Sequence, residues 1–177
     1  MLATISYQNK NYKIDFLKPL DISISLCAGE KNVNAWYAPP VKIEPVVMGN
    51  WVGDVKQGGS VNFRNVFLNP HAHGTHTECV GHISKEDFSL NQSLKEFFFG
   101  AQLITISPKN TNGDFIVTLE QMKQKLNAFI PEAVIIRTIP NTLEKLTKQY
   151  SNTNPPYIAA DAISFLVDNK VQHLLID

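Results

Sequence analysis

Four of the five histidines of the chain lie in one short stretch, residues 70–82, which reads PHAHGTHTECVGH. Imidazole and carboxylate groups are the usual protein ligands of zinc and manganese. The candidate ligands in this stretch are His71, His73, His76, Glu78 and His82. No other segment has a comparable density of ligating side chains, so the sequence predicts a divalent metal site here.

The spacing of these residues indicates which of them can meet. In an extended segment alternate side chains point to the same face, so His76, Glu78 and His82 would lie together. The two histidines before Gly74 have the opposite parity, and a glycine permits the bulge or turn that brings one of them round. His71 and His73 are therefore competitors for a third ligand position. The alternative is a loop in which the histidines form hydrogen bonds and bind no metal.

Composition limits the class of protein. The chain has 177 residues, of which 44% are hydrophobic and 18% are charged, which is ordinary for one globular domain. We predict a single domain over residues 1–177. Sixteen basic and sixteen acidic residues give a net charge of zero, which argues against nucleic acid or an anionic membrane as a partner.

Two other features bear on the location of the protein. No apolar run resembles a signal peptide, and none approaches the roughly 20 residues needed to span a bilayer. We therefore expect a cytoplasmic protein with no membrane partner. Cys27 and Cys79 are far apart in the sequence, and in such a protein they are expected to be reduced.

The first part of the chain shows the patterns of antiparallel strands. Residues 4–16 alternate loosely around a polar turn and predict a hairpin. Residues 20–26, LDISISL, are apolar at every second position, which predicts a half-buried strand. The loop that follows carries Trp36 and Tyr37, two large aromatic residues that suggest a pocket. Residues 50–68 predict a second hairpin that leads into the histidine-rich stretch.

From residue 101 onward the patterns of strands and helices alternate. Apolar runs predict strands at residues 101–106, 133–137 and 173–177. Apolar residues spaced by three and four predict helices at residues 119–129 and 159–169. Thr118 and Gln121 form the pattern of a capping box at the start of the first helix, and residues 108–114 predict a loop. This order implies a parallel sheet, and with the N-terminal hairpins it predicts an α/β fold.

The histidine-rich stretch resembles the HxGTHxDxPxH signature of the metal-dependent cyclase family, which includes bacterial kynurenine formamidases and isatin hydrolases. Gly74-Thr75-His76 and His82 match the signature. Glu78 stands where the family has aspartate, and Val80 where it has proline. Ala72 stands in place of the first histidine, so a neighbouring histidine would have to supply that ligand.

Two other stretches are similar to the family, and the resemblance covers essentially the whole chain. Asp21-Ile22-Ser23 with Trp36 is similar to its N-terminal segment of Asp-Leu-Ser/Thr and tryptophan, and Arg137-Thr138 is similar to its Arg-Thr. The resemblance implies a swivelling β/β/α-type domain with a parallel sheet, an antiparallel sheet and outer helices. It also implies a C-terminal segment with a further histidine and glutamate, so we predict that the chain, which ends at Asp177, is truncated.

The resemblance further implies an arylformamidase-like amidohydrolase. Such an enzyme uses a metal-activated water to cleave a formamide, amide or lactam bond in a small aromatic substrate, with zinc or manganese as cofactor. His82 would be the catalytic acid/base, and Trp36 would bind the substrate by stacking. The family also suggests a homodimer. The alternative function is a non-catalytic metal-binding or scaffold protein that retains the fold.

Overall fold

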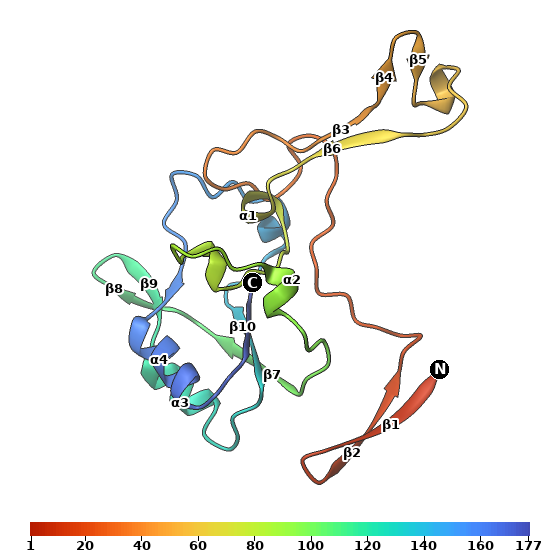
Figure 1. Cartoon of the computed structure of the whole chain (residues 1–177). Helices are drawn as coiled ribbons and strands as arrows, with labels where there is room; N and C mark the ends of the chain where they lie inside the picture. Colours follow the sequence, from red (N-terminus) through yellow and green to blue (C-terminus); the bar gives the residue numbers. More distant parts are fainter. The chain divides into compact units, whose positions relative to one another are not determined.

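The computed structural model describes residues 1–177, which form two compact units (Figure 1). Unit 1 comprises Met1–Ile22, Phe88–Asn141 and Pro155–Asp177, and unit 2 comprises Ser23–Asp87 and Thr142–Asn154. Both units are assembled from separate segments of the chain. The expectation of a single domain over residues 1–177 stays a prediction. None of the helices has the length and apolar character needed to cross a membrane.

A three-stranded parallel sheet forms the centre of unit 1. Its strands, in the order β12-β10-β7, are β12 (His173–Ile176), β10 (Ala133–Thr138) and β7 (Ala101–Ile106). β10 is parallel to both neighbours, and its Val134 is fully buried. The predicted strands and their parallel arrangement are confirmed. The central strand β10 is the most buried of the three, which agrees with its continuous apolar run.

Helices α3 (Leu119–Lys125) and α4 (Ala160–Asp168) contact each other in unit 1 (Figure 1). The predicted capping box at the start of α3 is present. The predicted extension of this helix to Phe129 is wrong, since α3 ends at Lys125 and the Phe129 side chain is 42% exposed. The core residues of unit 1 are Ile104, Ile106, Val117, Met122, Leu126, Val134, Ile136, Ala162 and Leu166.

A second sheet of unit 1 occupies the region predicted as a loop at residues 108–114. Strands β8 (Lys109–Thr111) and β9 (Asp114–Val117) form an antiparallel pair, and β11 (Tyr157–Ile158) lies parallel to β9. Asn112 and Gly113 both have positive φ, which is the requirement of a tight two-residue hairpin turn. The loop prediction is therefore wrong, although its turn residues were correctly recognised as turn formers. A short helix α2 (Leu90–Ser93) completes this unit.

The N-terminal hairpin is confirmed, but the strand predicted after it is not. β1 (Leu2–Tyr7) and β2 (Lys10–Asp15) are antiparallel and joined through Gln8 and Asn9. Residues 20–26 form no strand, and Leu20 is 92% exposed. Alternation alone does not make a strand, because the backbone groups also need a neighbouring strand as a partner.

Unit 2 contains two short antiparallel pairs, which Figure 1 shows as a long ribbon with a small hairpin at its end. The strands are β3 (Lys42–Pro45), β4 (Val47–Met48), β5 (Trp51–Val52) and β6 (Arg64–Phe67), and a 3-10 turn, η1 (Val55–Gln57), follows β5. β3 pairs with β6, and β4 pairs with β5. The predicted hairpin within residues 50–68 is therefore wrong in its pairing, because both partners lie before residue 50. The fold class, α/β with parallel and antiparallel sheets and helices, is confirmed.

Candidate metal centre

The histidine-rich stretch begins with one helical turn rather than an extended strand. α1 (Pro70–His73) follows Asn69, whose side-chain oxygen accepts a hydrogen bond of 3.0 Å from the His71 N–H. Proline is favoured in the first turn because the N–H it lacks has no partner inside the helix, and asparagine is a preferred N-cap. The helical turn, and not a bulge at Gly74, directs His71 toward Glu78.

The second half of the stretch has no regular secondary structure over residues 76–79 and then forms a 3-10 turn, η2 (Val80–His82). The prediction of one extended face from His76 to His82 is therefore wrong in its last residues. The outcome for the side chains is nevertheless similar, since the 3-10 turn brings His82 back toward Glu78. Glu78 and His82 are four residues apart, which is the spacing of neighbours on one face of a helix, and their side chains approach each other.

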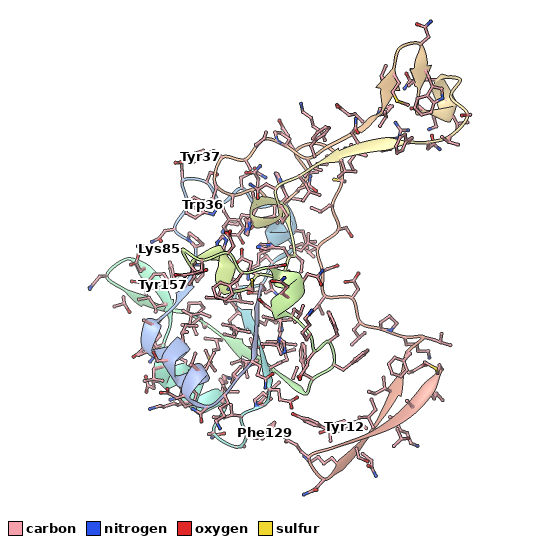
Figure 2. The ribbon with its side chains drawn as sticks, viewed as in Figure 1. Tyr12, Trp36, Tyr37, Lys85, Phe129 and Tyr157 are labelled. Carbon is pink, nitrogen blue, oxygen red and sulfur yellow. The ribbon has the colours of Figure 1, made fainter.

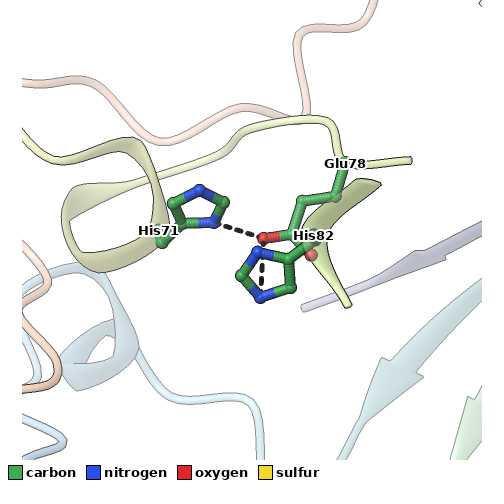
Figure 3. A group of neighbouring side chains, drawn as sticks. All are labelled: His71, Glu78 and His82. Atoms are coloured by element: carbon green, nitrogen blue, oxygen red, sulfur yellow. Dashed lines mark hydrogen bonds and ion pairs between the residues drawn. The ribbon is translucent and has the colours of Figure 1, made fainter. Parts of the chain in front are cut away.

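Three imidazoles converge on one carboxylate oxygen, Oε1 of Glu78. Figure 3 shows two of them, His71 and His82. The distances are 2.5 Å from His71 Nδ1, 3.1 Å from His76 Nε2 and 3.7 Å from His82 Nε2. Ligand atoms of His71, Glu78 and His82 lie within 4.8 Å of one another. The rings of His71 and His82 are stacked with their centroids 4.4 Å apart. The side chains are partly exposed, so an ion can reach the cluster from solvent.

The hydrogen bonding of His76 shows that this arrangement suits a cation. His76 Nδ1 lies 2.7 Å from the carbonyl oxygen of Gly74, which can only accept, so Nδ1 carries a proton. In the neutral ring the Nε2 atom then has a lone pair, and it faces an oxygen of Glu78 that also has lone pairs. Two acceptors 3.1 Å apart need a shared proton or a cation between them. The donor set of imidazoles and a carboxylate therefore fits a divalent metal ion.

Electrostatics keep Glu78 ionised. Without a cation, a proton shared with His76 makes that contact a hydrogen bond. Burial raises the pKa of the Glu78 carboxyl group, but hydrogen bonds from His71 and His76 and the charge of His82 together lower the pKa below its ordinary value. A carboxylate that stays ionised is the form that binds a metal ion.

His73 is not part of this cluster. Its side chain is buried, with 2% of its surface exposed. Its Nδ1 atom accepts a hydrogen bond of 3.0 Å from the backbone N–H of Asn69. Of the two competing histidines, the structure thus places His71 beside Glu78 and directs His73 into the interior of unit 2. Ala72, between them, is buried.

Trp36 also lies outside the cluster. It stands on a turn with Tyr37, both residues have positive φ, and both rings are exposed (Figure 2). The indole of Trp36 is 82% exposed, so it is available to a ligand but is not packed against the histidines. Its predicted contact with a substrate stays a prediction.

Two residues that position the cluster were not predicted. Asn69 caps α1, and the pair Asn69-Pro70 before the histidines was an available signal for a helix start. Thr75 Oγ1 accepts a hydrogen bond of 2.9 Å from the Ile24 N–H, which ties the stretch to the segment before it. At Gly74 a Cβ atom would lie 3.1 Å from Leu26 Cδ2, so a larger residue there would require the Leu26 side chain to shift. Cys27 and Cys79 form no disulfide with each other.

The fold and the site together define a mixed α/β protein with a candidate His/Glu metal centre. A family model described as "Putative cyclase" matches residues 20–177, which is most of the chain and includes every residue of the cluster. The chain belongs to this cyclase family. No curated protein sequence matches it. The N-terminal hairpin β1–β2 lies outside the matched range.

Proposed function

We propose that this cyclase-family enzyme is a metal-dependent hydrolase of an amide-type bond, a formamide, amide or lactam, in a small aromatic substrate. The observation that supports the proposal is the convergence of His71, His76 and His82 on the Glu78 carboxylate. A zinc or manganese ion bound there supplies a Lewis acid, which polarises a carbonyl group and lowers the pKa of water toward about 7.

The distances support separate roles for the histidines. His71 and His76 lie closest to the Glu78 oxygen, and we assign these three residues to holding the ion. His82 is the most distant of the three imidazoles, and its ring is half-exposed. Because His82 is the imidazole farthest from the Glu78 oxygen, we assign it to proton transfer.

In the proposed reaction His82 Nε2 accepts a proton from the attacking water. The water oxygen forms a bond to the carbonyl carbon, and the carbon–nitrogen bond breaks. His82 returns the proton to the leaving nitrogen, so the products are an acid and an amine. A positioned acid/base of this type contributes about a hundred- to ten-thousandfold to the rate. The exposed indole of Trp36 offers a flat apolar face for an aromatic substrate.

Activity measurements on His82→Asn test the assignment. The metal-loaded protein is assayed on a panel of aryl formamides, aryl amides and lactams, and metal content is measured in parallel. We expect His82→Asn to retain its metal and to lose about a hundred- to ten-thousandfold in kcat. Loss of metal together with activity would make His82 a ligand. Full metal occupancy of the wild-type protein with no turnover on the panel would refute the hydrolase proposal.

A second function is supported by Ala72, which stands where the family signature has a histidine and whose methyl group cannot bind metal. In this alternative the chain is a non-catalytic metal-binding or scaffold protein. Metal analysis of protein purified without a chelator separates the functions. Near-stoichiometric metal that is lost in a His76→Ala, Glu78→Ala double variant supports the enzyme when turnover accompanies it, whereas no bound metal favours the scaffold.

A further inference from the structure

Unit 2 contains an open cleft of about 910 Å³ that shares no residue with the metal cluster. One wall is the loop that includes Asn32, Asn34 and Tyr37, and the other is the segment that includes Gln149 and Ser151. His73 also lines the cleft, although only 2% of its surface is exposed.

The two walls are fixed to each other by hydrogen bonds, so the cleft is preformed. The Asn34 N–H donates to the Lys148 carbonyl at 3.1 Å, and the Tyr150 N–H donates to the Asn34 carbonyl at 2.7 Å. The Gln149 side-chain amide donates to the Asn32 carbonyl at 2.9 Å. A site held in this way loses little conformational entropy when a ligand binds.

The buried imidazole of His73 brings a hydrogen-bond donor to this cleft. Because Nδ1 accepts from the Asn69 N–H, the neutral ring carries its proton on Nε2. The amide nitrogen of Asn34 lies 3.5 Å from Nε2. The same nitrogen donates to the Ala38 carbonyl at 2.8 Å, which fixes it as nitrogen rather than oxygen. Two donors therefore lie side by side, and one oxygen acceptor on the cleft side of the pair could accept a hydrogen bond from each.

Tyr37 supplies a rigid aromatic face beside these donors. Its φ is 56°, a backbone conformation that is costly for a bulky residue and persists only where the surroundings impose it. Its N–H donates to Ser151 Oγ at 2.9 Å, and its hydroxyl donates to Asn152 Oδ1. The ring nevertheless remains 71% exposed. The fold thus holds an aromatic side chain in place while leaving its surface open.

We propose that this cleft binds a small planar aromatic molecule through a carbonyl or carboxylate oxygen. The oxygen accepts hydrogen bonds from His73 Nε2–H and the Asn34 amide, and the aromatic ring of the ligand packs on Tyr37. The opposite charges of Glu30 and Lys31, which also line the cleft, offset each other. A molecule with a neutral carbonyl group can therefore bind here, and so can one with a carboxylate. The site does not depend on the metal cluster.

Titrations monitored by NMR test the proposal on the full chain in a metal-free buffer with a chelator. The probes are benzoate, benzamide and cyclohexanecarboxylate. We expect benzoate, benzamide or both to bind with a dissociation constant on the order of 1 mM, with shifts at the His73 and Tyr37 signals. Binding of benzoate alone identifies a carboxylate site, and binding of both identifies a carbonyl site. Cyclohexanecarboxylate should bind about tenfold more weakly than benzoate, or not at all, because it cannot stack.

Variants locate the binding. Tyr37→Leu, at a position that is 71% exposed, should weaken binding about tenfold through loss of the aromatic contact. His73→Phe removes the donor and should abolish saturable binding. Tyr12→Leu, a comparable change in unit 1, is the matched control and should leave the affinity unchanged. His71→Ala should also leave it unchanged, which separates this proposal from the metal-dependent function.

Three outcomes would overturn the proposal. The first is the absence of saturable shifts for both aromatic probes at the wild-type protein. The second is equal affinity in the wild type and Tyr37→Leu. The third is a long-range ¹H–¹⁵N spectrum in which the His73 proton resides on Nδ1, since that tautomer offers no donor to the cleft. The last measurement needs no variant, so a misfolded His73→Phe would leave the proposal open to refutation.

Discussion

Replacing His71 by alanine, with His73→Gln as its matched control, tests which histidine serves the metal centre. His71 Nδ1 lies 2.5 Å from the Glu78 oxygen, whereas the His73 side chain is buried and bonded to Asn69. His71 is partly exposed, so its truncation should not disturb the fold. Glutamine in place of His73 can still accept the hydrogen bond from Asn69, so the helical turn that carries His71 should be preserved.

The size of the effect follows from the role of a direct ligand. Changing only a group that supports a ligand costs 10–100-fold in metal affinity in typical sites. Removing one of three donors should therefore cost at least about 100-fold, which is about 2.7 kcal/mol. At a metal concentration of about 100 times the wild-type dissociation constant, the ion stabilises the wild type by about 2.7 kcal/mol and the variant by only about 0.4 kcal/mol.

Thermal unfolding in the presence and absence of zinc measures this difference. For a chain of this size about 1 kcal/mol corresponds to about 2–4 °C in Tm. The zinc-induced increase in Tm should thus be smaller in His71→Ala than in the wild type by about 5–9 °C. His73→Gln should retain the wild-type increase. An unchanged zinc effect in His71→Ala, or an equal loss in both variants, would show that the assignment of the ligand is wrong.

Three further predictions concern single residues. In the metal-free protein the Glu78 carboxyl should titrate below its ordinary pKa, because the hydrogen bonds from His71 and His76 and the charge of His82 outweigh burial. The ion pairs of Glu78 are then present above this lowered pKa and are lost as the pH falls through it. A ¹³C NMR titration should show the midpoint moving up in His71→Ala, and an unchanged midpoint contradicts this cause. Thr118→Ala removes one half of a capping box and should lower the free energy of unfolding by about 1 kcal/mol in urea denaturation, whereas Thr118→Ser should be nearly neutral. Met122→Ala empties a fully buried position and should cost about 2–5 kcal/mol in the same assay; a cost below that of the cap variant would contradict its place in the core.

The parallel sheet of unit 1 could be predicted because its signals are local and redundant. The run Ala133–Thr138 is continuously apolar until its last two residues, and the capping pattern at Thr118 marks a helix start independently of the apolar stripe. Residues 20–26 carried a strand pattern of equal quality, but no partner strand lies beside them. Whether a strand forms thus depends on pairing with distant residues, which the local pattern does not contain.

The hairpins show the same limit from the other side. The turn at Asn112-Gly113 was recognised, but β8 is polar and fully exposed, so no apolar pattern identified it as a strand. In unit 2, the apolar residues of β6 predicted a strand, yet its partner is β3 and not the segment directly before it. A sequence indicates where a turn is possible, whereas the register of pairing is decided by the whole unit.

The candidate metal centre was more predictable than its surroundings because one continuous segment builds it. The ligating atoms of His71, His76, Glu78 and His82 are brought together by a helical turn, an irregular segment and a 3-10 turn in succession. Each of these is set by neighbouring residues, of which Asn69-Pro70 is the clearest.

The cleft at His73 is different, since its second wall comes from the segment that includes Gln149 and Ser151. The hydrogen-bond donors of this cleft depend on which nitrogen of His73 faces Asn34. That orientation follows only from the folded arrangement of Asn69, Asn34 and Ala38. A site formed by one segment can therefore be inferred from residue types and spacing, whereas a site formed between distant segments needs the structure.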